Sequence, residues 1–171
     1  MTDQAASLEV ISIVDSNDRL LGSKPRGQMR KEGGFYRVTY ILVFSSSGQL
    51  LVQRRTDLKD WCPGRLDFTA GGIVTFDEPY RLSAERETFE ELGVRPELKF
   101  CFKTWYEDTT VTPVNANWGC VYSCVHDGPF ALQESEVADA YFVNVEDAML
   151  MSPGDVTPDT RQVLLRWRLM S

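Results

Sequence analysis

Alternating and continuous apolar runs, separated by turn-forming residues, predict strands along most of the chain. The most apolar run, "FYRVTYILVF" from Phe35 to Phe44, is rich in β-branched and aromatic residues and predicts a central strand. The turn "SSSG" follows it, and residues 49–55 then predict its hairpin partner. A short strand is expected after the Pro-Gly turn in "WCPGRLDFTAGG". The other strands are predicted at residues 8–14, 20–25, 98–107, 118–126 and 141–145.

Helical patterns interrupt the strands, and the clearest runs from Pro79 to Leu92. Asp77 or Glu78 is expected to cap its start, and Gly93 to end it. Further helices are expected at residues 26–32, 145–151 and 158–169. These elements predict an α/β or α+β fold, with helices packed on a mixed sheet.

A helical wheel divides the 79–92 helix into two faces. Apolar and small side chains are expected to pack against the sheet, whereas the glutamates are expected on the opposite side. The predicted packing set is Tyr80, Leu82, Ala84, Thr88, Phe89 and Leu92. The predicted carboxylate set is Glu87, Glu90 and Glu91.

Composition narrows the class of protein. The chain has 171 residues, 43% of them apolar and 25% charged, which suits one globular domain covering residues 1–171. The net charge of −7 argues against nucleic acid and against anionic membranes as partners. No apolar run reaches membrane-spanning length, and the N-terminus lacks signal-peptide features, so a cytoplasmic location is expected. The four cysteines form no C-x-x-C pair and His126 is the single histidine, which disfavours zinc.

The three glutamates near the end of the 79–92 helix need an explanation. Like charges this close repel one another, and the helix dipole disfavours negative charge at this end. The alternative to a functional site is a solvated acidic face. A divalent metal site would offset the repulsion, because Mg²⁺ prefers oxygen ligands and often bridges carboxylates and phosphate groups.

These residues resemble the Nudix box, G-x5-E-x7-R-E-U-x-E-E-x-G-U, in which U is a bulky apolar residue. Thr88 stands where the first U is expected, which is a mild departure. The resemblance implies a Nudix hydrolase domain, with a mixed sheet sandwiched between helices and the box at residues 72–94. The matching positions are Gly72, Glu78, Arg86, Glu87, Glu90, Glu91, Gly93 and Val94.

The resemblance also implies roles for the residues of the box. Glu87, Glu90 and Glu91 would hold Mg²⁺ or Mn²⁺, with the carbonyl of Gly72 as a further ligand. Arg86 would orient the glutamates and Glu78 would brace the loop. Glu87 and Glu91, with Arg86, are the expected catalytic residues, and Glu87 would help to deprotonate the attacking water.

A wider similarity, from Glu9 to Val94, is to Nudix proteins related to isopentenyl diphosphate isomerase. It implies that Arg55 and Lys59 bind the diphosphate of the substrate. The cysteine and histidine that such an isomerase needs correspond to Gly71 and Ile73 here. An isomerase-like enzyme therefore remains only an alternative, as does a nucleotide-binding module without catalysis.

The expected activity is metal-dependent hydrolysis of a phosphoanhydride bond in a nucleoside di- or triphosphate or a related nucleoside-diphosphate compound. The preferred base and the oligomeric state stay open. Glu136, and with it Glu134, could supply an additional acid, with ordinary loop acids as the alternative. A long polar connection is predicted at residues 106–119. Four aromatic residues could stack on a base or belong to the core: Trp61, Trp105, Tyr106 and Trp118.

Overall fold

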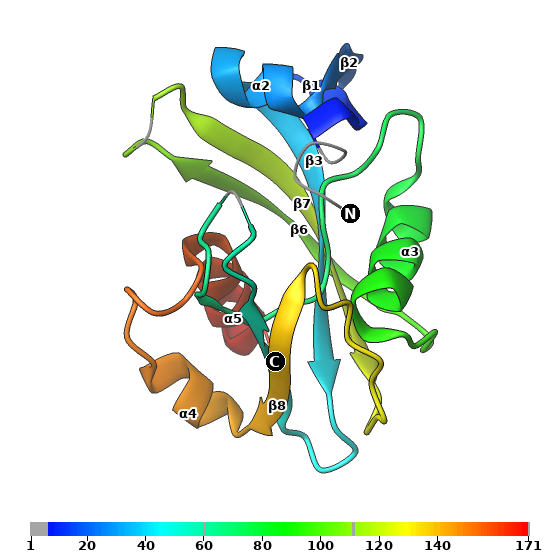
Figure 1. Ribbon diagram of the computed structural model, residues 1–171, viewed down its shortest axis with the longest axis vertical. Helices are drawn as coiled ribbons and strands as arrows, with labels where there is room; N and C mark the ends of the chain where they lie inside the picture. Colours follow the sequence, from blue (N-terminus) through cyan, green and yellow to red (C-terminus); the bar gives the residue numbers. More distant parts are fainter. Residues whose placement is uncertain (1–6, 60, 111, 171) are drawn as a thin grey trace.

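The computed structural model describes residues 7–59, 61–110 and 112–170 (Figure 1). Its strands are β1 (Val10–Val14), β2 (Leu20–Pro25), β3 (Gly34–Phe44), β4 (Leu50–Arg55), β5 (Leu66–Asp67), β6 (Lys99–Asp108), β7 (Asn115–Val125) and β8 (Val137–Val143). Its helices are α2 (Arg26–Glu32), α3 (Tyr80–Leu92), α4 (Val145–Leu150) and α5 (Pro158–Met170). No helix in these described ranges is long and apolar enough to cross a membrane.

All eight strands join one mixed sheet with β3 near its centre. The main order is β2-β1-β3-β4-β5, while β7 pairs with β3, β6 with β7 and β8 with β4. The β3–β7 pair is parallel along its whole length, from Gly34–Asn115 to Phe44–Val125, and the other strand pairs are antiparallel. The prediction of a mixed sheet with helices packed on it is therefore confirmed.

The hairpin predicted between β3 and β4 opens immediately after its turn. The two strands pair at Phe44 and Leu50, and the same edge of β4 then pairs with β5. The other edge of β4 pairs with β8. The chain that follows β5 enters the opening and pairs with β3 through Ala70 and Ile73. This path brings the double glycine, residues 71–72, alongside the central strand. The predicted partnership of the two strands is confirmed at the turn, but β5 takes the place of β3 along the rest of that edge of β4.

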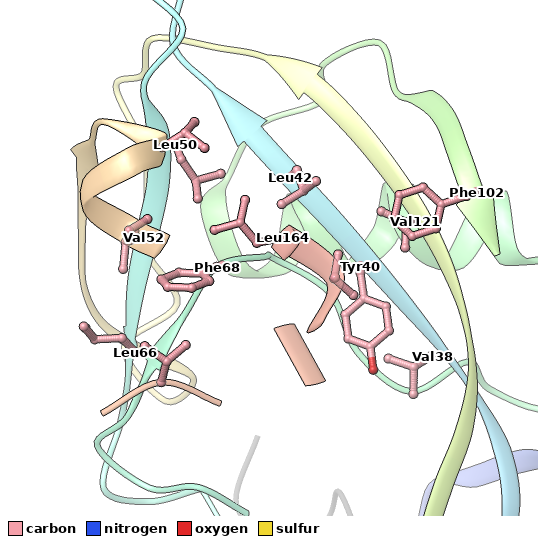
Figure 2. Close-up of a cluster of buried hydrophobic side chains, with 14 of the residues drawn as sticks. Val38, Tyr40, Leu42, Leu50, Val52, Leu66, Phe68, Phe102, Val121 and Leu164 are labelled. Carbon is pink, nitrogen blue, oxygen red and sulfur yellow. The ribbon is translucent and has the colours of Figure 1, made fainter. Parts of the chain in front are cut away.

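Helices cover both faces of the sheet, and each face has its own apolar core (Figure 1). On one face, Ala84 and Leu92 of α3 belong to the same cluster as Ile41 of β3. On the other face, Leu164 of α5 lies among Leu42, Phe68 and their neighbours, as Figure 2 shows. Side chains as deeply buried as these each contribute about 1.5–3 kcal/mol to folding.

Helix α3 differs from its wheel prediction in which side chains are buried. Ala84, Thr88 and Leu92 are buried as expected, but Leu82 and Phe89 are exposed, and Glu91 is buried instead. The helix therefore turns part of its carboxylate set towards the protein interior. No side chain caps its start, contrary to the prediction for Asp77 or Glu78, whereas Gly93 ends it in the left-handed conformation as expected.

Two other boundaries also differ from the predictions. Strand β8 begins at Val137 rather than near residue 141, because it pairs with β4 along its whole length. The polar connection predicted at residues 106–119 is mostly strand, since β6 runs to Asp108 and β7 begins at Asn115. Pairing between β6 and β7 extends both strands through polar sequence, and so shortens the loop.

Candidate active site

A cavity of about 320 Å³ opens beside β3, between the end of α3 and the start of α5. This volume is in the range of small-molecule sites. Its lining includes Gly71 and the box residues Gly72, Arg86, Glu87, Glu90 and Glu91. It also includes the polar residues Tyr36, Tyr40, Asn117 and Asp159, and the loop and strand residues Arg55, Lys59, Trp61 and Glu136.

Arg86 holds the acidic side chains of the box together. Its guanidinium donates two hydrogen bonds to Glu78, at 3.0 and 2.9 Å. It also donates to Glu87 at 2.8 Å and to Glu90 at 3.0 Å. These contacts, led by the hydrogen bonds to Glu78, raise the pKa of Arg86 still further, so its charge is permanent. One cation therefore offsets part of the repulsion among three carboxylates.

Glu91 is held separately, deeper in the structure. Its Oε2 accepts a hydrogen bond from the backbone N–H of Gly71 at 3.2 Å and from the amide of Gln53 at 3.3 Å. Burial raises the pKa of Glu91, while the nearby charge of Lys59 opposes that rise. A carboxylate in this position is oriented by its donors but only partly neutralised.

Glu87 lies directly against Gly72, which explains the need for glycine there. A methyl group on Gly72 would come within 2.7 Å of the carboxyl carbon and both carboxyl oxygens of Glu87. Burial, followed by the charge of Glu91, raises the pKa of Glu87 to about 8. Gly71 is constrained even more strongly, because a side chain there would meet the carbonyl of Thr39 at 2.0 Å.

The carbonyl of Gly72, expected to bind metal, accepts hydrogen bonds from the backbone N–H of Thr39 at 2.9 Å and from its hydroxyl at 3.4 Å. Within the described residues, no three His, Cys, Asp or Glu side chains form a group arranged to hold a metal ion. The donor set nevertheless fits a divalent cation, because Glu87, Glu90 and Glu91 line one cavity with carboxylate oxygens.

Lys59 and Glu136, predicted independently, form an ion pair, and both line the cavity. Burial lowers the pKa of Lys59, whereas the charge of Glu91 opposes that change. Lys59 therefore lies within electrostatic reach of the box glutamates.

Arg55 also lines the cavity, but its guanidinium is engaged with the protein. It donates to the carbonyls of Trp61 and Cys62 at 2.9–3.2 Å, and to Asp67 at 3.3 Å. It also lies over the Trp61 ring, 5.7 Å from the ring centre. Arg55 thus anchors the turn that carries Trp61 to the cavity wall.

Most of the remaining candidates from the sequence lie outside the cavity. Of the four aromatic candidates, only Trp61 lines the cavity, whereas Trp105 and Trp118 contact each other with ring centres 5.5 Å apart. Glu134 is exposed and His126 bonds the backbone N–H of Gly128. The four cysteines are free thiols, and Cys120 and Cys124 share one buried cluster.

Sequence reasoning missed two groups of cavity residues. The first is the buried polar set Tyr40, Asn117 and Asp159, which comes from β3, β7 and α5. No sequence spacing connects these residues, and an aspartate in the first turn of a helix is too common to be a signal. The second group comes from the N-terminal segment and comprises Glu9, Arg26, Met29, Arg30 and Gly33.

The family model described as the NUDIX domain matches residues 34–167. The chain is 40% identical over 164 residues to the Nudix hydrolase YfcD of Escherichia coli K12, covering 95% of this chain and 88% of the relative. It is 44% identical over 150 residues to the Nudix hydrolase PA4841 of Pseudomonas aeruginosa, covering 87% of each. These names give a family and no substrate.

Solved structures show the same fold at low sequence identity. The DR0079 protein of Deinococcus radiodurans has a TM-score of 0.77 at 22% identity, covering 92% of this chain and 98% of that one. The MutT protein of Methanosarcina mazei Go1 has a TM-score of 0.69 at 20% identity, covering 80% and 94%. The NUDIX domain of NrtR from Shewanella oneidensis, complexed with ADP ribose, has a TM-score of 0.60 at 15% identity, covering 80% and 86%.

The N-terminal elements β1, β2 and α2 lie outside the matched region, yet Glu9 and residues of α2 supply part of the cavity wall. Three observations point to the same family: the box with its carboxylates around Arg86, the fold and the sequence relatives. The chain belongs to the Nudix hydrolase family.

Proposed function

We propose that this protein is a metal-dependent hydrolase that cleaves a phosphoanhydride bond in nucleoside di- or triphosphates or related nucleoside-diphosphate compounds. One observation carries the proposal. Three glutamates of one helix line a small-molecule cavity, and the cations Arg86 and Lys59 line it with them. The ADP ribose bound by the NrtR domain shows that this fold can hold a nucleoside-diphosphate compound.

Glu87, Glu90 and Glu91 would hold Mg²⁺ or Mn²⁺. A cation there would neutralise charge on the phosphate oxygens and lower the pKa of a water molecule. Arg86, which touches Glu87 and Glu90, holds these carboxylates in place. Glu78 in turn holds Arg86 through two hydrogen bonds, so the loop before α3 supports the site. Gly72 contributes chiefly the bare surface against which Glu87 lies.

Glu87 is the proposed proton acceptor for the attacking water. As a carboxylate beside the metal-binding glutamates, it would accept the proton that the attacking water releases. Glu91, oriented by the N–H of Gly71, would remain an oxygen donor. Glu136, through its ion pair, positions the ammonium group of Lys59, which binds phosphate oxygens as a point charge. Arg55 supports Trp61 and Asp67, and its own contact with phosphate remains a prediction.

The test is release of phosphate or pyrophosphate from nucleoside triphosphates, nucleotide sugars and dinucleoside polyphosphates. The purified protein is incubated with each compound in Mg²⁺ or Mn²⁺, with and without excess chelator. We expect turnover of at least one compound and its loss on chelation. Binding of a nucleotide with no release under any metal condition would overturn hydrolysis and indicate a binding module.

A further inference from the structure

Gln53 is a buried polar residue near the middle of β4. It is 3% exposed, and its backbone pairs with Asp67 of β5 on one side and with Ala140 of β8 on the other. Its side chain lies on the same face of the sheet as that of Leu51, two residues earlier, which packs in the same cluster as the buried residues of α3. An amide enclosed between a strand and a helix has to find its hydrogen-bond partners inside the protein.

The NH₂ group of Gln53 connects two parts of the site. It donates to the backbone carbonyl of Thr69 at 2.9 Å and to Oε2 of Glu91 at 3.3 Å. Thr69 lies two residues before Gly71, whose own N–H also donates to Oε2 of Glu91, at 3.2 Å. One side chain of β4 therefore joins the segment that leads into the double glycine to the last turn of α3.

The orientation of the Gln53 amide follows from these two contacts. A reversed amide would place its oxygen against two acceptors, the carbonyl of Thr69 and the carboxylate of Glu91. In the observed orientation Oε1 is buried and has no hydrogen-bond donor within the described residues. A buried acceptor without a donor is costly. Gln53 therefore makes its favourable polar contacts through the NH₂ group, although its own oxygen is left unsatisfied.

Both donors to Glu91 reach the same carboxylate oxygen. The N–H of Gly71 and the NH₂ group of Gln53 each bond Oε2, so these contacts leave Oε1 for another partner. The two donors come from different segments of the chain, so they restrict the rotation of the carboxylate as well as its position. Gln53 itself is not among the described residues that line the cavity, whereas Glu91 is.

We propose that Gln53 is a positioning residue for the proposed cation site: it holds Oε2 of Glu91 and so leaves Oε1 available to the divalent cation. This inference rests on the proposed function, because it assigns a cation to the glutamates of α3. Loss of a hydrogen-bond partner of a metal-binding side chain typically reduces metal affinity or activity by about 10- to 100-fold. Gln53 acts through Glu91 and has no contact with substrate.

The first experiment measures Mn²⁺ binding to the metal-free protein without nucleotide, from the loss of the electron paramagnetic resonance signal of the free ion. Gln53→Met keeps the length of the side chain but has no donor, and we expect its Kd for Mn²⁺ to rise by about 10- to 100-fold. Gln53→Leu is a second apolar variant, for use if methionine does not pack at this position. Wild-type affinity in either folded variant would overturn the proposal.

Ser12→Ala is the matched control for the loss of a buried hydrogen bond. Ser12 is a buried residue of β1, and its hydroxyl donates to the backbone carbonyl of Thr75 at 3.2 Å, a contact that involves no glutamate. We expect this variant to bind Mn²⁺ as the wild type does. An equal loss of affinity in Ser12→Ala and in Gln53→Met would show a general structural effect and overturn the positioning role.

A double-mutant cycle tests whether Gln53 acts through Glu91. In the Glu91→Gln background, Gln53→Met should weaken Mn²⁺ binding by less than about threefold, because the carboxylate that Gln53 positions is already gone. The same loss in both backgrounds would overturn this route, since Gln53 would then affect the cation site independently of Glu91.

Turnover separates this inference from the proposed function. We expect Gln53→Met to raise the Mg²⁺ concentration needed for half-maximal activity, with KM for the nucleotide unchanged within about twofold. Weaker Mn²⁺ binding by Gln53→Met in a protein that hydrolyses no nucleotide supports the positioning role and refutes hydrolysis alone. Hydrolysis with equal Mn²⁺ binding by wild type and Gln53→Met removes the positioning role and leaves the proposed function standing. Failure of the wild type to bind Mn²⁺ would overturn both.

Discussion

The carboxylate of Glu87 lies against the bare α-carbon of Gly72, within 2.7 Å of the point a methyl group would occupy. The loop and the helix of the box therefore meet through this pair. The atoms that would clash are the flexible end of a side chain, so the helix can stay in place while the carboxylate moves. The position of Glu87 thus depends on the absence of a side chain at residue 72.

Replacing Gly72 by alanine tests this dependence. We expect kcat to fall by about 10- to 100-fold, because a displaced catalytic group loses its alignment, with a change in unfolding free energy below about 1 kcal/mol. Gly154→Ala is the matched control, since its nearest neighbour would be Ser152 at 3.8 Å. Unchanged kcat in Gly72→Ala would contradict the role given to this contact.

Glu91→Gln tests the most deeply buried carboxylate of the box. The amide keeps an oxygen for the N–H of Gly71 but loses the charge. We expect the protein to fold and kcat to drop by several orders of magnitude, with at least about 100-fold lost through charge alone. Pyrophosphate or phosphate release with Mg²⁺ measures the effect. Glu134→Gln, at an exposed position, is the control, and wild-type turnover in Glu91→Gln would refute the assignment.

Because the pKa of Glu87 is raised, we expect the stability of the metal-free protein to depend on pH. Its pKa is about 8 in the folded chain against 4.5 ordinarily, so the folded state retains a proton that the unfolded state releases. The contribution of Glu87 to the free energy of unfolding is therefore most favourable below about pH 4.5, and it declines as the pH rises to 8. Glu87→Gln removes the decline, and we expect it to be more stable than wild type by about 2–4 kcal/mol at pH 8.

Urea unfolding of both proteins at pH 5 and pH 8, in chelator, measures this difference. Most of the advantage of Glu87→Gln should disappear at pH 5. Glu85→Gln, at a half-exposed position of the same helix where Glu85 pairs with Arg81, is the control and should show no such trend. An equal advantage at both pH values would show that the gain comes from packing and not from the charge.

Arg55→Lys separates a structural role from phosphate binding. Lysine cannot reproduce the fork that reaches the carbonyls of Trp61 and Cys62 as well as Asp67. We expect a loss of about 2 kcal/mol in unfolding free energy. Arg54→Lys, which removes one exposed hydrogen bond to Gly64, should cost far less. A raised KM with unchanged stability would instead favour direct contact between Arg55 and substrate.

The sequence predicted most elements because their patterns are local. Strand β3 is a continuous apolar run, and α3 ends at a glycine that adopts the expected left-handed conformation. The buried side of α3 could not be predicted from hydrophobicity. Glu91 is buried because Gly71 and Gln53, which are distant in sequence, donate hydrogen bonds to its carboxylate. The opening of the hairpin was not predicted, since it depends on β5 pairing with β4 and on residues 70 and 73 pairing with β3.

The box residues of the site were more predictable than the buried polar residues Tyr40, Asn117 and Asp159. Box residues share one helix and one loop, so their spacing identified them. The Asn117–Tyr40–Asp159 contacts join three elements, and no local pattern connects those elements. Only the folded sheet, which places β7 beside β3 and α5 over its face, brings them together.

Two neighbouring residues of β3 line the cavity: Thr39 bonds the carbonyl of Gly72, and Tyr40 touches Asp159. Successive side chains of a strand emerge on opposite sides, so a single peptide unit links the layer of α3 to the layer of α5. A shift or change of twist in β3 would therefore displace the glycine loop and the first turn of α5 together.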